Sequence, residues 1–171
     1  MMKQDTNNYW EQLERLEKLI RASELKAGII FSFHSLILGL FIDRLENFEA
    51  IFKESTLVFI FAICWIIMVL ISIFYCFKCF HPKMELKNEE NVFFFRDAAL
   101  KYGNIKQYAQ KLTQVCETEE EIINQLSQQI FVESKIVNQK FISVQKAIKS
   151  FAISFIFVIF ILVFWGFSID F

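Results

Sequence analysis

The sequence predicts an all-α membrane protein with three transmembrane helices and a cytosolic helical bundle, whose outer helices continue into the first and third spans. The spans are indicated by three runs without Asp, Glu, Lys or Arg, at residues 27–42, 57–77 and 151–169. A helix needs roughly 20 apolar residues to cross ~30 Å of hydrocarbon; the second and third runs meet this length and the first approaches it. Composition agrees, because 55% of the residues are hydrophobic and only one is Pro, as helical spans require.

Before the first run, residues 8–26 predict an amphipathic helix. Apolar side chains recur there at the spacing of one helical stripe, at Tyr9, Leu13, Leu16 and Ile20. Neither Pro nor Gly interrupts this segment. The helix is therefore predicted to run on into the membrane.

Between the second and third runs, residues 78–150 predict a charged helical module. His81–Glu90 contains Pro82 and several charges and is expected to be a linker. A short helix is expected over Asn91–Leu100, where the aromatic run is expected to enter the core. A second helix is expected over Ile105–Cys116.

The last predicted helix is the longest. Thr118 and Glu121 have the spacing of a capping box, in which each side chain bonds a free backbone N–H. No Gly or Pro follows until after Trp165, so a helix of about 48 residues and ~70 Å is expected. Its stripe suits pairing with the N-terminal stripe and consists of Ile122, Leu126, Ile130, Val137, Phe141, Val144 and Ile148.

Basic residues predict the orientation, because Lys and Arg gather on the cytoplasmic side of membrane proteins. They are frequent in the N-terminal segment and in the charged module, and scarce in the loop between the first two runs. The N-terminus and the module are therefore predicted inside, and the C-terminus outside. The predicted organisation is a cytosolic helix at 1–26, a span at 27–42, an extracytoplasmic loop at 43–56, a span at 57–77, a cytosolic module at 78–150 and a span at 151–169.

Chemistry-bearing motifs are few. Cys76, Cys79 and His81, with Cys116 elsewhere, resemble part of a zinc ligand set. The spacing is compressed and no second Cys pair follows, so reduced cysteines at the membrane boundary are the favoured interpretation and no metal is expected. The chain has two His and four unclustered Gly, which argues against an enzyme. The net charge of −1 gives no reason to expect nucleic-acid binding.

His34 is the ionisable residue of the first span and is flanked by Ser32 and Ser35. Such residues usually face protein or water and often have a function. The three could line a pore or gate. The simpler alternative is a neutral His that hydrogen-bonds another helix. Both interpretations predict that this face of the span contacts protein rather than lipid.

The order of these features resembles a known family, the transmembrane effectors of Pycsar, a bacterial pyrimidine cyclase anti-phage system. The resemblance covers about residues 10–168. Its segments are "KAGIIFSFHSLILGLF", "NVFFFRDAALKYGNIKQYAQKL" and "QLSQQIFVESKIVNQKFISVQKAI". Its most recognisable positions are Lys26–Ala27, Asn91, Phe93–Phe94, Gln128, Ser134, Lys135 and Lys140. Val92 is a departure, because family members often carry Pro beside the Asn.

The resemblance implies a mechanism. A partner cyclase makes cyclic UMP or cyclic CMP during phage infection, and the effector responds by impairing the bacterial inner membrane, so that infection aborts. It implies a nucleotide second messenger and membrane lipids as partners, and no cofactor. A homo-oligomer is expected because the three spans of one subunit cannot enclose a water-filled pore. Two other functions stay open from the residues alone: a structural membrane adaptor whose coiled-coil base recruits a soluble partner, and a constitutive small channel or holin-like protein.

The chemistry of a cyclic nucleotide indicates which side chains could contact it. Arg suits a phosphate through its planar fork, and an aromatic ring suits a base. Arg96 is the Arg of the charged module, and Asn91, Lys101 and Tyr102 are close to it in sequence. The alternative is that Arg96 is a surface charge beside a core of Phe side chains.

Overall fold

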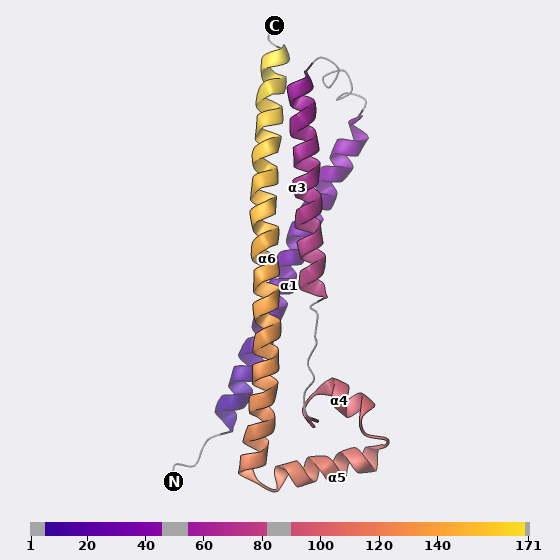
Figure 1. Ribbon diagram of the computed structural model, residues 1–171, viewed down its shortest axis with the longest axis vertical. Coiled ribbons are helices and arrows are strands. Elements are labelled where there is room, and N and C mark those ends of the chain that lie inside the picture. Colours follow the sequence, from indigo (N-terminus) through magenta and orange to yellow (C-terminus); the bar gives the residue numbers. More distant parts are fainter. Residues whose placement is uncertain (1–5, 46–54, 82–89, 170–171) are drawn as a thin grey trace. The chain divides into compact units, whose positions relative to one another are not determined.

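The computed structural model describes residues 6–45, 55–81 and 90–169, with side chains described to residue 164. All regular structure in these ranges is helical. The helices are α1 (Asn7–Asp43), α3 (Thr56–Phe80), α4 (Phe95–Leu100), α5 (Ile105–Cys116) and α6 (Glu119–Ile169) (Figure 1). Three of them, α1, α3 and α6, are long and apolar enough to cross a membrane. The all-helical class and the three apolar helices are thus confirmed.

The two longest helices are continuous, as predicted. Helix α1 has 37 residues and α6 has 51. The chain divides into two compact units, and each of these helices contributes to both. The first unit comprises the described residues of Met1–Ala22 and Lys83–Asn138; the second comprises those of Ser23–Pro82 and Gln139–Phe171. Grouping of the cytosolic helices in a bundle stays a prediction, as do the six segment boundaries. Most of the predicted 43–56 loop and 81–90 linker lies outside the described residues.

The second unit is built on a seam of buried side chains in which Ala, Ser and Cys predominate. In α3 the buried positions alternate by four and three residues: Val58, Ala62, Trp65, Val69, Ser72, Cys76 and Cys79. The same alternation marks α1, at Ser23, Ala27, Ile30 and His34, and α6, at Ser143, Ala147, Ser150 and Ser154. Ala27, Ile30, Cys76, Cys79, Val144 and Ala147 form one cluster. Small residues let helices approach closely where lipid replaces water.

The predicted α6 stripe was wrong at two positions. Phe141 and Ile148 are 36% and 45% exposed, whereas Ser143 and Ala147 are buried. In this part of α6 the buried face is the one with the smaller side chains, Ser143 and Ala147. Small side chains allow α6 to pack closely against its neighbours, and Ala147 belongs to the cluster named above. Leu126, Val137 and Val144 are buried as predicted.

The first unit buries the apolar stripe of α1 as expected but shortens one helix. Leu13 and Leu16 of α1 are buried, at 7% and 5% exposed. Helix α4 begins at Phe95 rather than Asn91, and residues 91–94 form a turn. Phe95 is 77% exposed, so its predicted core position was wrong.

The start of α6 shows half of the predicted capping box. The Glu121 N–H donates to Thr118 Oγ1 at 3.4 Å. The Glu121 carboxylate instead accepts from Gln125 Nε2 at 3.2 Å. The acidic first turn also suits the positive end of the helix dipole.

Candidate functional site

In the first unit, the turn that precedes α4 is held against α6 by Asn91. The Asn91 side chain is 2% exposed. Its Nδ2 donates to the Gln125 carbonyl at 2.7 Å and to Gln128 Oε1 at 3.4 Å. Its Oδ1 accepts from the Phe93 N–H at 2.9 Å, which is an Asx-type turn. Asn91 therefore has a structural role, whatever else it contacts.

Gln125 completes this attachment of the turn to α6. The Gln125 Oε1 accepts from the Val92 N–H at 3.1 Å, and the Gln125 Nε2 donates to the Glu90 carbonyl at 3.4 Å. We call this group the loop clamp (Asn91, Val92, Gln125 and Gln128). Gln125 is 6% exposed, and Val92 is 1% exposed. Gln125 is not predictable from the sequence, because a Gln beside an apolar stripe has no distinctive spacing.

Asp97 forms hydrogen bonds with Asn91 and Lys101, two of the four residues that the sequence predicted as ligand contacts. Its Oδ2 accepts from the Asn91 N–H at 3.1 Å and from Lys101 Nζ at 3.1 Å. The third, Tyr102, packs its ring edge-on to Tyr108, with centroids 5.4 Å apart. Burial raises the pKa of Tyr102, and the charges of Glu90 and Asp97 raise it further. The fourth, Arg96, is exposed.

The geometry around Asp97 permits competition. The side chains of Asp97 and Lys101 are 16% and 34% exposed. An ion pair that is partly exposed to solvent contributes little stability. A phosphate could replace Asp97 as the partner of Lys101 through charge-assisted hydrogen bonds. Asp97 also anchors the Asn91 N–H. Replacement of Asp97 by a phosphate as the partner of Lys101 would therefore alter a bond of Asn91, which belongs to the loop clamp.

In the second unit, Lys140 joins α1, α3 and α6. Its side chain is 3% exposed, and Nζ donates to Glu24 Oε1 at 2.7 Å and to the Cys79 carbonyl at 2.7 Å. The last four carbonyls of a helix lack partners within it, so Lys140 caps the C-terminus of α3. Cys79 Sγ donates to the Ser23 carbonyl at 3.7 Å. We call this group the three-helix junction (Ser23, Glu24, Cys79 and Lys140).

Farther along the seam of the second unit, His34 is 1% exposed. Its ring lies edge-on to the Phe151 ring, with centroids 5.1 Å apart. Among the described residues, its Nε2 has no hydrogen-bond partner. The prediction that this face meets protein is confirmed within the unit.

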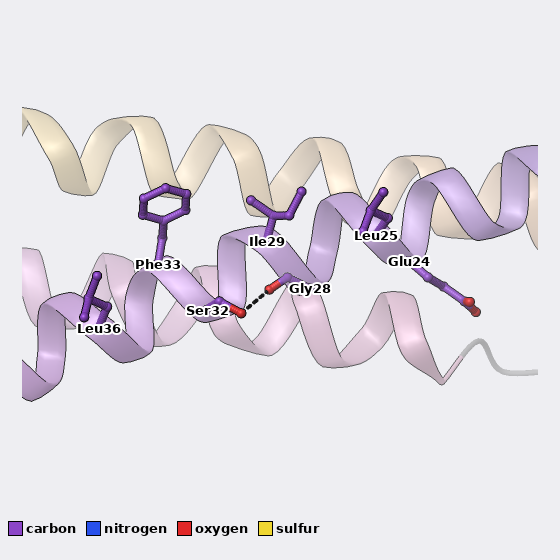
Figure 2. Close-up of a pocket in the computed structure, with 7 residues that line it drawn as sticks. All are labelled: Glu24, Leu25, Gly28, Ile29, Ser32, Phe33 and Leu36. Carbon is purple, nitrogen blue, oxygen red and sulfur yellow. Dashed lines mark hydrogen bonds between the residues drawn. The ribbon is translucent and has the colours of Figure 1, made fainter.

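The structure does not bring Ser32 and Ser35 together with His34. Both are exposed, and each hydroxyl donates to its own helix, Ser32 to the Gly28 carbonyl at 2.9 Å and Ser35 to the Phe31 carbonyl at 3.0 Å. Figure 2 shows this bond from Ser32 to the Gly28 carbonyl. The two residues belong to a stretch of α1 that lines a groove of about 590 Å³. The groove is lined by Glu24, Leu25, Gly28, Ile29, Ser32, Phe33 and Leu36.

The cysteines are separate thiols. Cys76 and Cys79 are buried and Cys116 is exposed. Within the described ranges, no group of three His, Cys, Asp or Glu side chains is arranged to hold a metal ion.

Comparison with known proteins gives one result. A family model described as the Pycsar effector protein domain matches residues 8–167. No curated protein and no solved structure matches the chain. The matched range includes the loop clamp, the three-helix junction and His34.

Proposed function

The chain belongs to the Pycsar effector protein family, and we propose that it is an anti-phage effector that responds to a cyclic pyrimidine nucleotide and impairs the inner membrane. A partner cyclase supplies cyclic UMP or cyclic CMP. The response aborts the infection by stopping the growth of the infected cell.

Helix continuity is the observation that carries this proposal. Helices α1 and α6 each contribute to both units without a break. A shift or rotation of a rigid helix at one end displaces its other end. Binding in the first unit can thus act on the apolar helices of the second unit through the chain itself.

The ligand contacts are proposed on the surface beside the loop clamp. Arg96 and Lys101 bind the phosphate, and Tyr102 stacks on the base. Phosphate binding draws Lys101 from Asp97 and so changes the charge balance at the carboxylate that accepts from the Asn91 N–H. Asn91 then transmits nucleotide binding to α6, because its side chain donates to the Gln125 carbonyl.

The membrane arrangement follows the basic residues. The N-terminus and residues 78–150 lie in the cytoplasm, and the C-terminus lies outside. Several copies assemble, with membrane lipids around their apolar faces. His34 acts at the gate, while Ser32 and Ser35 face away from it.

The test uses the full chain in liposomes that contain a small fluorescent dye. Cyclic UMP or cyclic CMP is expected to release the dye, and linear UMP or CMP is not. Nucleotide binding is measured on the same protein in detergent. Leakage without nucleotide would favour a constitutive channel, and binding without leakage would contradict membrane impairment.

Arg96→Ala tests the proposed ligand site. Loss of the planar phosphate contact is expected to raise the nucleotide concentration for half-maximal release at least tenfold. Lys106→Ala, an exposed cation at the start of α5, is the matched control and should leave release unchanged. Equal effects of the two variants would remove Arg96 from the site.

A further inference from the structure

The hydroxyl and imidazole groups of the seam face inward in the second unit. His34, Ser72, Ser150 and Ser154 are 1%, 0%, 7% and 3% exposed. They come from all three long helices. In contrast, the exposed positions of α3 between Leu57 and Phe77 are Leu, Ile and Phe, and those of α6 between Phe151 and Phe164 are Ala, Ile, Leu, Val and Phe.

The bonding of these groups identifies the least satisfied one. Ser72 donates to the Ala147 carbonyl at 2.9 Å, and Ser154 donates to the Phe151 carbonyl at 2.7 Å. His34 Nε2 is buried without a partner among the described residues. A buried polar atom without a hydrogen bond is costly, and a water molecule would remove that cost.

The ring of Phe151 is placed to keep water away. It lies 5.1 Å from the His34 ring and 6.4 Å from the Phe33 ring, centroid to centroid. Phe151 also packs against the central cluster of the unit. Separation of α1 from α6 here would uncover His34 on one side and the serines on the other.

We infer that the seam face, marked by His34, Ser72 and Ser154, lines the aqueous path for small hydrated ions when the effector is active. Ionisable and polar residues within spans mark ion paths, and the outer faces of α3 and α6 lack such groups at their exposed positions. The structure, with its packed seam, is the closed state. In assembled copies, separation of the helices along the seam admits water to the path. This inference rests on the proposed function and specifies the face that conducts.

Cysteine accessibility tests the inference in full-length protein within liposomes. In a background with Cys64, Cys76, Cys79 and Cys116 replaced by Ala, seam positions are tested as Ser72→Cys and Ser154→Cys. Leu70→Cys and Ile156→Cys are matched controls, each two residues away on the same helix and exposed. A charged, membrane-impermeant thiosulfonate reagent is added with and without cyclic nucleotide.

The expected result is that nucleotide raises labelling of the two seam cysteines at least tenfold and leaves the two controls unlabelled. Nucleotide-triggered leakage with the seam protected and the controls labelled would overturn the inference and leave the proposed function intact. Nucleotide binding without any leakage would overturn the proposed function, and the path with it.

His34→Leu gives a second measurement. Removing the imidazole takes away the ionisable group of the path, so leakage at saturating nucleotide is expected to fall at least fivefold. Nucleotide binding should be unchanged, which also shows that the variant is folded. Full leakage in a variant that binds nucleotide would exclude His34 from the path.

Discussion

Among the described residues, the second unit buries serine side chains beside its apolar core, whereas the buried polar side chains of the first unit are amides. In the first unit, Leu13, Leu16 and Leu126 are buried, as water demands of apolar groups. In the second unit, Phe74 is 62% exposed, whereas Ser72 of the same helix is fully buried. Lipid is as apolar as a Phe side chain, so close packing and hydrogen bonds decide which face turns inward.

The two units are also held together by different interactions. The first unit relies on neutral side chain to backbone bonds around a turn, through Asn91 and Gln125. The second relies on a close-packed seam and one buried charge, Lys140. Variants of each kind should therefore fail by different mechanisms and by different amounts.

The largest effect is expected at the three-helix junction. Glu24→Ala leaves the Lys140 ammonium buried with the Cys79 carbonyl as its remaining partner. Removing one partner of a buried pair costs about 3–5 kcal/mol, and Glu24 is 41% exposed, so about 3 kcal/mol is expected. The free energy of unfolding in detergent, measured by thermal melting, checks this value.

Lys140→Met separates charge from packing at the same place. It removes the buried ammonium, keeps the side-chain volume and leaves the Glu24 carboxylate accessible to water. A cost of about 1 kcal/mol is expected from the lost bond to the α3 terminus. If Lys140→Met destabilises as much as Glu24→Ala, the buried charge is not what dominates this junction.

Close packing of the seam predicts the next largest effect. Ala147 is fully buried in the central cluster, so Ala147→Leu is expected to cost about 2–3 kcal/mol through overpacking. Ala152→Leu makes the same change at an exposed position of α6 and should be nearly neutral. Equal melting temperatures for the two variants would contradict a close-packed seam.

Helix extent was largely predictable from the sequence, because runs of apolar residues and the absence of Gly and Pro are local signals. The same signals do not identify which face of a long helix turns inward. Phe141 and Ile148 fitted a helical stripe, yet the seam selected Ser143 and Ala147. Size rather than hydrophobicity was the informative property there.

The candidate site was less predictable. His34 was identified because a polar residue within an apolar run is conspicuous. Asn91 was identified for a ligand, whereas the structure gives it five hydrogen bonds within the fold. Gln125 and the pairing of Lys140 with Glu24 depend on contacts between residues distant in sequence, which no local pattern reports.

Neutral hydrogen bonds in the first unit predict a smaller effect than the buried charge. Gln125→Ala leaves the buried Val92 N–H without its acceptor, so about 1–3 kcal/mol should be lost. Gln125→Glu retains that acceptor but replaces the donor to the Glu90 carbonyl and the Glu121 carboxylate with a negative charge, so it should also be destabilising at pH 7. Hydrogen exchange of residues 90–94 should accelerate in Gln125→Ala but not in Asn124→Ala, the exposed neighbour. Unchanged exchange would show that Gln125 does not hold the turn.

The smallest effect is a gain in stability, at Glu133 in the first unit. Burial raises the pKa of Glu133 above its usual 4.5, and the Glu17 charge adds to this, while a bond from Gln129 opposes it. The folded state therefore binds a proton more tightly than the unfolded state, so unfolding free energy rises as pH falls from above the raised pKa toward 4.5. Glu133→Gln keeps the acceptor for Gln129 and should stabilise the protein at pH 7 by about 0.5 kcal/mol or less.

The difference between Glu133→Gln and the original chain should shrink as the pH falls through this range, because both side chains are then neutral. Melting temperatures from pH 7 to pH 4 measure it. Glu17→Gln should reproduce part of the gain by removing the neighbouring charge. A difference that stays constant with pH would show that packing, rather than ionisation of a carboxylate in the first unit, separates the two proteins.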